Sequence, residues 1–208
     1  RGALRDALNE AMRAEIVDRN VAALAEPRRH TPKPKSILTP MVLQAVIDAE
    51  DRPVFRALWL FLAVQGARPH SEAAPLTWGS LVVSEGLYWY RGSKTMAGQR
   101  PRPIDPRLIP ELEAVRIPGC DLVFPTSKGT MIGERTLIRA WKQALARVEA
   151  PDVPLYSLRA FAVTQLLEAG QDRNVVGALV GHASGGVTER NYEIIRESRV
   201  ADLVRKRG

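Results

Sequence analysis

Apolar positions at helical spacing run through most of the chain. Near the N-terminus they predict one amphipathic helix over residues 3–24, carried by Leu4, Leu8, Met12, Ile16, Val17 and Leu24. A second helix is expected to open at Thr39-Pro40, because threonine caps a helix and proline suits its first turn, and to run to about Glu50. A third is expected from Pro53 to Gln65, where Gly66 ends it.

Apolar residues at helical spacing occur again further along the chain. Helices are expected at about 70–75, 106–116, 134–148, 158–168, 172–180, 187–195 and 198–205. Between them the period changes, and short strands are predicted at 81–83, 87–90 and 102–104, punctuated by glycines. Leu122 to Phe124 reads as a buried strand or a short extended piece. The fold class is therefore mainly α with a small antiparallel β-sheet, an α+β arrangement.

A proline-rich basic segment separates the first helix from the rest. Residues 25–36 contain three prolines and read as a semi-rigid linker. Its cations could lie along DNA phosphates, or the segment could be an ordinary solvated linker; they are Arg28, Arg29, Lys33 and Lys35. With 208 residues and 45% hydrophobic composition, the chain can bury one domain plus a short appendage.

The net charge of the chain indicates which kinds of binding partner are favoured. A formal net charge of +7 favours polyanions, nucleic acid first, although an ordinary soluble basic protein would show the same balance. A lone cysteine, Cys120, forms no internal disulfide, which fits a reducing cytoplasm. No apolar run approaches the ~20 residues of a membrane span. Because the chain starts at Arg1 without methionine, we read it as a fragment.

Five separated residues suit metal-free cleavage of DNA. A phosphodiester gains negative charge in its transition state, and arginine forks such as those of Arg68 and Arg159 match its oxygens. A hydroxyl must attack, for which Tyr192 is the candidate. Lys94 or His182 could protonate the departing sugar oxygen. Taken singly, each residue is more often structural than functional.

Their order and context resemble the tyrosine recombinase (phage integrase) family over roughly residues 37–196. Gly66-Ala-Arg68 with Glu72 resembles its first arginine block, and Lys94 its hairpin lysine. Leu158-Arg159 and the residues to Gly170 are similar to the second arginine block. The next two blocks match Val176 to His182 and Asn191-Tyr192.

The resemblance implies the tyrosine-recombinase catalytic fold and a role for each matching residue. Tyr192 would attack the scissile phosphate and form a 3′-phosphotyrosine, while Arg68 and Arg159 hold the non-bridging oxygens. Lys94 would donate a proton to the leaving 5′ oxygen, and His182 would bond the phosphate. No metal or other cofactor is implied, because the phosphotyrosine stores the bond energy.

Three places depart from the family pattern. Tyr156 stands where the family has histidine, and its hydroxyl can bond a phosphate without carrying positive charge. The interval from Arg68 to Glu72 is one residue longer than usual. The interval from His182 to Tyr192 is also slightly long. Tyr156 is nevertheless included among the catalytic candidates.

The resemblance also predicts domains and partners. Residues 1–24 would be the last helix of a truncated N-terminal DNA-clamping domain, 37–196 the catalytic domain and 197–208 a C-terminal helix or tail. That tail would pack on a neighbouring protomer or on its own domain. The expected partners are double-stranded DNA, other copies in a tetramer on DNA and accessory DNA-bending factors, without a membrane.

A basic stretch on the expected hairpin could enter a DNA groove beside the cleavage site, with Arg100 and Arg102 as contacts. The leading hypothesis is a site-specific recombinase or integrase of a mobile element. Two alternatives stay open: a type IB topoisomerase, which uses similar chemistry, and a DNA-binding module that has lost catalysis, as Tyr156 would allow.

Overall fold

The computed structural model describes residues 2–25, 38–90 and 101–180. It separates into two compact units, residues 1–34 and residues 35–208. No helix in the described ranges is long and apolar enough to cross a membrane.

The N-terminal unit holds two helices where the sequence predicted one. Helix α1 spans Gly2–Arg13 and helix α2 spans Val21–Leu24. The single helix over 3–24 is therefore wrong. Glu15 adopts a left-handed φ of 55°, which ends α1, and Asn20 then begins α2. The Asn20 side chain accepts from the Ala23 N–H at 3.1 Å and donates back toward α1, to the Arg5 carbonyl at 2.8 Å.

The second unit contains the remaining elements, which follow the predicted order. They are α3 (Pro40–Asp48), α4 (Pro53–Gln65), the π turn η1 (Pro69–Ala73), the 3₁₀ turn η2 (Trp78–Ser80), β1 (Leu81–Val82), the 3₁₀ turn η3 (Val83–Glu85), β2 (Leu87–Tyr88), β3 (Arg102–Pro103), α5 (Leu108–Glu113), α6 (Glu134–Arg147), α7 (Ser157–Glu168) and α8 (Arg173–Val180).

Local signals at the helix ends act as expected. The Thr39 hydroxyl accepts from the Val42 N–H at 3.2 Å and caps α3. Gly66 follows α4 in the left-handed conformation, with φ of 62°. Asp172 accepts from the Asn174 N–H at 2.8 Å at the start of α8. These residues confirm the predicted start of α3, the end of α4 and the start of α8, whereas α3 ends at Asp48, two residues before the predicted Glu50.

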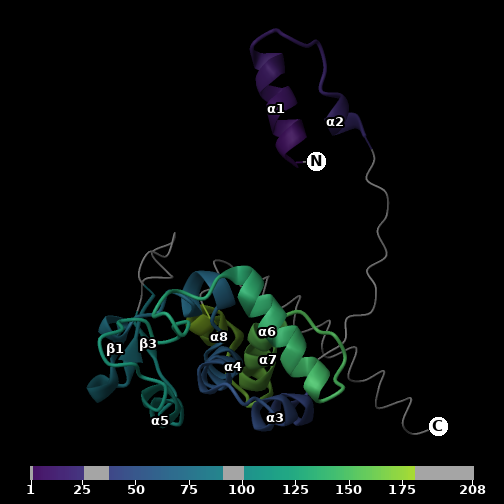
Figure 1. The fold of residues 1–208 in the computed structure, drawn as a ribbon. Coiled ribbons are helices and arrows are strands. Elements are labelled where there is room, and N and C mark those ends of the chain that lie inside the picture. The colour runs from purple at the N-terminus through teal and green to yellow at the C-terminus, as the bar shows by residue number, and fades with distance from the viewer. Residues whose placement is uncertain (1, 26–37, 91–100, 181–208) are drawn as a thin grey trace, which may run out of the picture. The chain divides into compact units, whose positions relative to one another are not determined.

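Helix α4 lies at the centre of the core. Trp59, Phe61 and Leu62 on α4 are each 0% exposed, and α4 packs most extensively against α7 (Figure 1). The sheet and α5 lie together to one side of these helices (Figure 1). This arrangement brings the end of α4 beside α7 and α8, which begin much later in the chain, at Ser157 and Arg173.

The sheet has three short antiparallel strands in the order β1-β2-β3. Leu81 pairs with Tyr88, and Tyr88 pairs in turn with Arg102. The predicted sheet is confirmed, and the extended piece at 122–124 bonds outside it, with the Val123 N–H donating to the Leu76 carbonyl at 2.9 Å.

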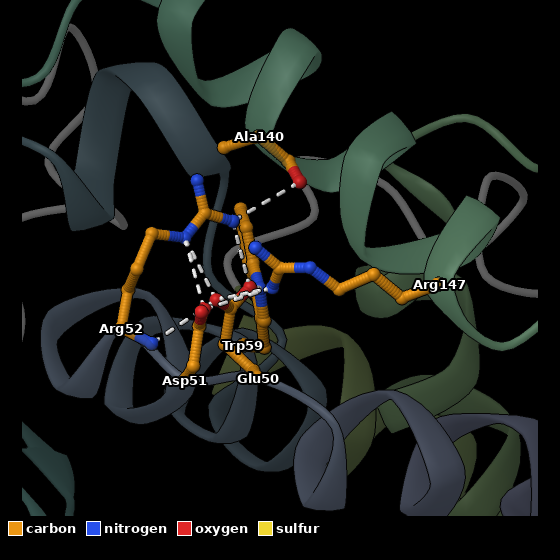
Figure 2. A network of polar contacts seen from close by, with 6 residues as sticks. All are labelled: Glu50, Asp51, Arg52, Trp59, Ala140 and Arg147. Carbon is orange, nitrogen blue, oxygen red and sulfur yellow. Dashed lines mark hydrogen bonds and ion pairs between the residues drawn. The ribbon is translucent and has the colours of Figure 1, made fainter.

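A buried carboxylate ties the α3–α4 connection to α6 (Figure 2). Glu50 has a fully buried side chain that accepts from Arg52 Nε at 2.7 Å, from Trp59 Nε1 at 3.1 Å and from Arg147 Nη1 at 2.9 Å. Arg52 also donates to the Ala140 carbonyl at 3.5 Å. Because Arg147 ends α6, these bonds fix that helix against α4.

Candidate active site

A single π turn shapes the segment that follows the first arginine. Arg68 precedes it with extended backbone, φ −74° and ψ 125°. The Ala73 N–H donates to the Arg68 carbonyl and the Ala74 N–H to the Pro69 carbonyl, each at 3.0 Å. Each of these hydrogen bonds spans five residues, whereas an α-helical bond spans four. The wider turn therefore accommodates the extra residue between Arg68 and Glu72. The sequence predicted a short helix at 70–75 here, and the structure corrects it to this wider turn.

The π turn directs Glu72 back toward Arg68. Glu72 Oε2 accepts from the Arg68 backbone N–H at 2.7 Å, and Oε1 accepts a short bond from the Arg68 guanidinium. Arg159 Nη1 lies 3.7 Å from the same Oε2. Glu72 is only 4% exposed, so one buried carboxylate lies between both arginines. The two arginines predicted to share a site do lie side by side.

Arg159 binds three segments together. Its Nη1 donates to the Gly66 carbonyl at 2.5 Å, and its Nη2 donates to the Val180 carbonyl at 2.6 Å. The residue is 2% exposed, and its Nε has no hydrogen-bond partner within the structure's described ranges. Burial lowers the pKa of Arg159, and the neighbouring positive charge of Arg68 acts in the same direction. With five N–H donors, the guanidinium keeps several for a further acceptor.

Gly66 makes this close packing of three helices feasible. A Cβ at Gly66 would lie 2.8 Å from Val180 Cγ1 and 3.3 Å from the Cβ of Ala162. Its φ of 62° also disfavours other residues. The end of α4, the middle of α7 and the end of α8 therefore meet at this glycine, two residues before Arg68.

Tyr156 lies at the start of α7, half exposed, and its hydroxyl interacts with Arg68. Burial alone would lower the pKa of Arg68, but the charge of Glu72 and its hydrogen bond, followed by Tyr156, outweigh burial and raise it. Arg68 is the more accessible of the two arginines, with 37% of its side chain exposed. It can therefore receive a ligand at the surface.

A cavity of about 600 Å³ opens beside Arg68 and Tyr156. Its walls come from η1, from α6 and from the segment before α7, and include His70, Leu137, Ile138 and Lys142. Ile138 and Lys142 also line a shallow groove along α6 with Arg135 and Arg139. Arg135, Arg139 and Lys142 recur at helical spacing, so their shared face is a signal that the sequence itself carries.

Neither Arg135 nor Arg139 has an ion-pair partner in the described part of the chain, whereas Lys142 lies 3.7 Å from Asp152, with both side chains mostly exposed. Such an exposed pair contributes little and is readily broken. The groove along α6 lined by Arg135, Arg139 and Lys142, the positive face of α6, therefore carries positive charge, whereas the cavity beside Arg68 is also lined by the acidic residues Glu134 and Asp152.

Several predicted site residues lie outside the described residues. They are the catalytic candidates Lys94, His182 and Tyr192 and the expected DNA contacts Arg28, Arg29, Lys33, Lys35 and Arg100. The expected helices at 187–195 and 198–205 lie outside as well. Arg68, Tyr156 and Arg159 are the catalytic candidates that the structure brings together.

Arg102 differs from the expectation that it contacts DNA. It is 3% exposed, and its guanidinium carbon lies 4.6 Å from the centre of the Tyr90 ring. Its place opposite Tyr88 on β2 turns the side chain toward the core. A direct contact with a DNA groove is not compatible with that burial.

The arrangement of Arg68, Arg159 and Glu72 suits an anion that has several oxygen atoms to accept hydrogen bonds. Two guanidinium groups and one carboxylate leave a net positive charge, and a phosphodiester would neutralise it. Further negative charge developing on the phosphate would be held by donors that are already in place. Among the described residues, no group of three or more His, Cys, Asp or Glu side chains could hold a metal ion.

Comparison with known proteins places the chain in a family. It matches the phage integrase family over residues 37–199, and it therefore belongs to that family of tyrosine recombinases, as a catalytic domain. No match was found among curated protein sequences.

Solved structures share the fold. A lambda integrase tetramer bound to a Holliday junction superposes with a TM-score of 0.76 at 19% identity, covering 91% of this chain and 57% of that one. XerA recombinase gives 0.68 at 17% identity, covering 85% of this chain and 66% of that one. The Tn1549 transposon integrase in complex with circular intermediate DNA gives 0.73 at 15% identity, covering 94% and 75%. The chain thus spans about two thirds or less of the first two.

Proposed function

We propose that the chain is the catalytic part of a site-specific DNA recombinase that cuts and rejoins DNA through a 3′-phosphotyrosine at Tyr192. The observation that carries this proposal is the convergence of Arg68 and Arg159 on the buried carboxylate of Glu72. Membership of the tyrosine recombinase family supports it. Several relatives of the same fold were solved bound to DNA, as a dimer or a tetramer.

In the proposed reaction the Tyr192 oxygen bonds to phosphorus and its proton passes to a neighbouring base or to water. The bond from phosphorus to the 5′ oxygen breaks, and that oxygen takes a proton from Lys94. Arg68 and Arg159 hold the non-bridging oxygens, and His182 donates a hydrogen bond to the phosphate. Rejoining reverses these steps, so no metal or nucleotide is consumed.

Tyr156 would bond the same phosphate, or orient Arg68 toward it, in place of the family's histidine. Its hydroxyl already acts on Arg68, which supports a place for it in the site. DNA would lie along the positive face of α6, and a tetramer on two DNA duplexes would carry out strand exchange.

Covalent trapping tests the proposal. Double-stranded DNA is first selected by binding from a random-sequence library and then nicked, so that the cleaved end diffuses away and the adduct accumulates. We expect the wild-type chain to form a protein–DNA adduct and Tyr192→Phe to bind the same DNA without forming one.

Other outcomes would assign the chain differently. DNA binding without an adduct from the wild-type chain would support a DNA-binding module that has lost catalysis. Relaxation of supercoiled DNA by a monomer, without strand exchange, would support a type IB topoisomerase. An adduct that survives Tyr192→Phe would place the nucleophile elsewhere.

A further inference from the structure

The π turn that follows Arg68 carries a histidine on its outer side. Within this turn Pro69 and Glu72 are buried, whereas His70 and Ser71 are exposed. Because the turn accommodates one extra residue between Arg68 and Glu72, it presents two consecutive side chains outward while Glu72 still reaches back to Arg68. His70 is thus fixed two residues from the more accessible arginine of the site.

His70 and Arg68 border the same cavity of about 600 Å³, and Tyr156 borders it from the start of α7. Much of the remaining wall is apolar, contributed by Pro69, Leu137, Ile138, Pro154 and Leu155. A phosphate bound to Arg68 would enter the space that His70 borders, and the apolar wall would lie beside the adjoining deoxyribose.

The fixed charges in and behind this cavity cancel. The group of two arginines and one buried carboxylate carries one net positive charge. In the cavity wall, Lys142 and Asp152 pair with each other at 3.7 Å. Glu134 also lines the cavity and has no ion pair in the ranges that the structure describes. Its carboxylate offsets the positive charge of the arginine group, so no fixed cation is left to match an entering phosphate.

Two further cations lie near the cavity without lining it. Arg135 and Arg139 line the neighbouring groove along α6. They attract DNA equally at every pH near neutrality, because a guanidinium stays charged. Once DNA covers the cavity and excludes water, the charges left inside it interact more strongly. The phosphate would then be poorly matched unless another group in the cavity became positive.

Histidine is the side chain that gains a positive charge near neutral pH. Among the described residues that line the cavity, His70 is the only histidine, and the Tyr156 hydroxyl can bond a phosphate only as a neutral group. A protonated imidazole has an N–H on each ring nitrogen and forms charge-assisted hydrogen bonds with phosphate oxygens. Protonated His70 would restore the match between the cavity and a phosphate.

We propose that His70 is a further ligand of the phosphate that Arg68 holds, and that DNA enters this cavity together with a proton taken up by the His70 imidazole. The proposal rests on the proposed function. The proton comes from solvent, the imidazolium N–H donates to a phosphate oxygen, and no covalent bond forms or breaks. DNA binding should therefore strengthen as the pH falls from 8 to 6.

The test is the affinity of the full chain for DNA at pH 6 and pH 8, at one salt concentration. The DNA is the duplex selected from the random-sequence library. We expect the wild-type chain to bind about tenfold more tightly at pH 6, since one charge-assisted hydrogen bond is gained. His70→Gln is neutral at both pH values and should reduce this ratio to within about twofold of unity.

His70→Lys separates charge from shape. A lysine is protonated at both pH values, so this variant should bind DNA at pH 8 about as tightly as the wild-type chain binds it at pH 6. A purely structural role for His70 would leave the wild-type ratio in His70→Gln, and lysine would not restore tight binding at pH 8.

Ser71→Ala is the matched control, because Ser71 is exposed on the same turn and lines the same cavity without a group that titrates near neutral pH. It should keep the wild-type ratio. A wild-type ratio near unity, a His70→Gln ratio equal to that of wild type, or a His70→Lys chain that binds at pH 8 no better than His70→Gln would overturn the role of His70.

Adduct formation by the same wild-type chain keeps the two proposals apart. An adduct without the expected pH ratios would overturn the role of His70 and uphold the proposed function. The expected ratios without an adduct would overturn the proposed function and leave His70 as a ligand of a DNA phosphate. No binding of DNA at either pH would overturn both.

Discussion

Glu72 determines how the two arginines of the site can coexist. Without a carboxylate, two adjacent guanidinium groups repel each other and tend to point apart. With Glu72 accepting from Arg68 and lying 3.7 Å from Arg159, both cations stay in place before any phosphate arrives. The site is therefore preorganised, and its donors need little rearrangement during the reaction.

The stability cost of replacing Gly66 by alanine can be predicted, and Gly86 serves as the control position. Gly66→Ala introduces a Cβ 2.8 Å from Val180 Cγ1 at a left-handed φ of 62°, whereas Gly86→Ala has nearly the same φ, 64°, with open space around it. We expect Gly86→Ala to cost about 1 kcal/mol of unfolding free energy from backbone strain alone. Gly66→Ala should cost about 2–4 kcal/mol, because overpacking adds to that strain.

Urea unfolding measures both variants. Because the Gly66 carbonyl also accepts from Arg159, Gly66→Ala should slow adduct formation as well, while Gly86→Ala should not. Equal destabilisation by the two substitutions would show that α4, α7 and α8 do not pack as closely as described.

At the scale of elements, the Glu50 network explains how α6 is held. Burial alone would raise the pKa of Glu50, but the hydrogen bonds from Arg52, Trp59 and Arg147 outweigh burial and lower it to about 2. Since α6 forms one wall of the cavity beside Arg68, this distant carboxylate supports the shape of the site.

The network predicts a defined dependence of stability on pH. The folded-state pKa of about 2 lies below the usual 4.5, so above pH 4.5 the stabilisation is fully present. As the pH falls from 4.5 toward 2, the unfolded chain takes up the proton first, and stability is lost. The contribution of Glu50 should be about 3 kcal/mol.

Urea unfolding between pH 7 and pH 2 checks this loss. Glu50→Gln should be less stable than wild type at neutral pH and should lose less of its remaining stability on acidification. Asp51→Asn is the control, because Asp51 has a 75% exposed side chain next to the same arginines and should leave the pH profile nearly unchanged. A Glu50→Gln profile parallel to that of wild type would contradict the account.

The positive face of α6 makes a second prediction at this scale. If DNA lies along it, Arg135→Ala and Arg139→Ala should each weaken DNA binding and reduce the slope of log affinity against log salt concentration by about 1. Arg116→Ala is the matched control, since that guanidinium stacks on Trp78. Titrations at several salt concentrations measure the slopes, and unchanged slopes for both α6 variants would exclude α6 from the DNA interface.

For the whole molecule, the sequence predicted most elements because their signals are local. Pro53 and Gly66 bracket α4, and Thr39 and Asp172 cap α3 and α8. The break between α1 and α2 was missed because Asn20 bonds back to Arg5, a tertiary contact that overrides helical periodicity. The long interval from Arg68 to Glu72 is visible in the sequence, yet only the backbone hydrogen bonds reveal that a π turn accommodates it.

The site was predictable to a similar extent. The convergence of Arg68 and Arg159 followed from the family resemblance, and their shared carboxylate was anticipated only as a nearby acid. The burial of Arg102 could not be predicted from its charge, because it depends on the register that sets it opposite Tyr88. Arg147, 97 residues from Glu50, shows how little sequence says about which ions will pair.

The most direct test of the central claim is the position of one phosphate relative to two guanidinium groups. The experimental structure of Tyr192→Phe bound to selected DNA provides it. We expect nitrogens of Arg68 and Arg159 to lie within about 3 Å of non-bridging oxygens on the same phosphate. Arginines on separate phosphates, or an Arg159 that contacts only the Gly66 and Val180 carbonyls, would contradict the account.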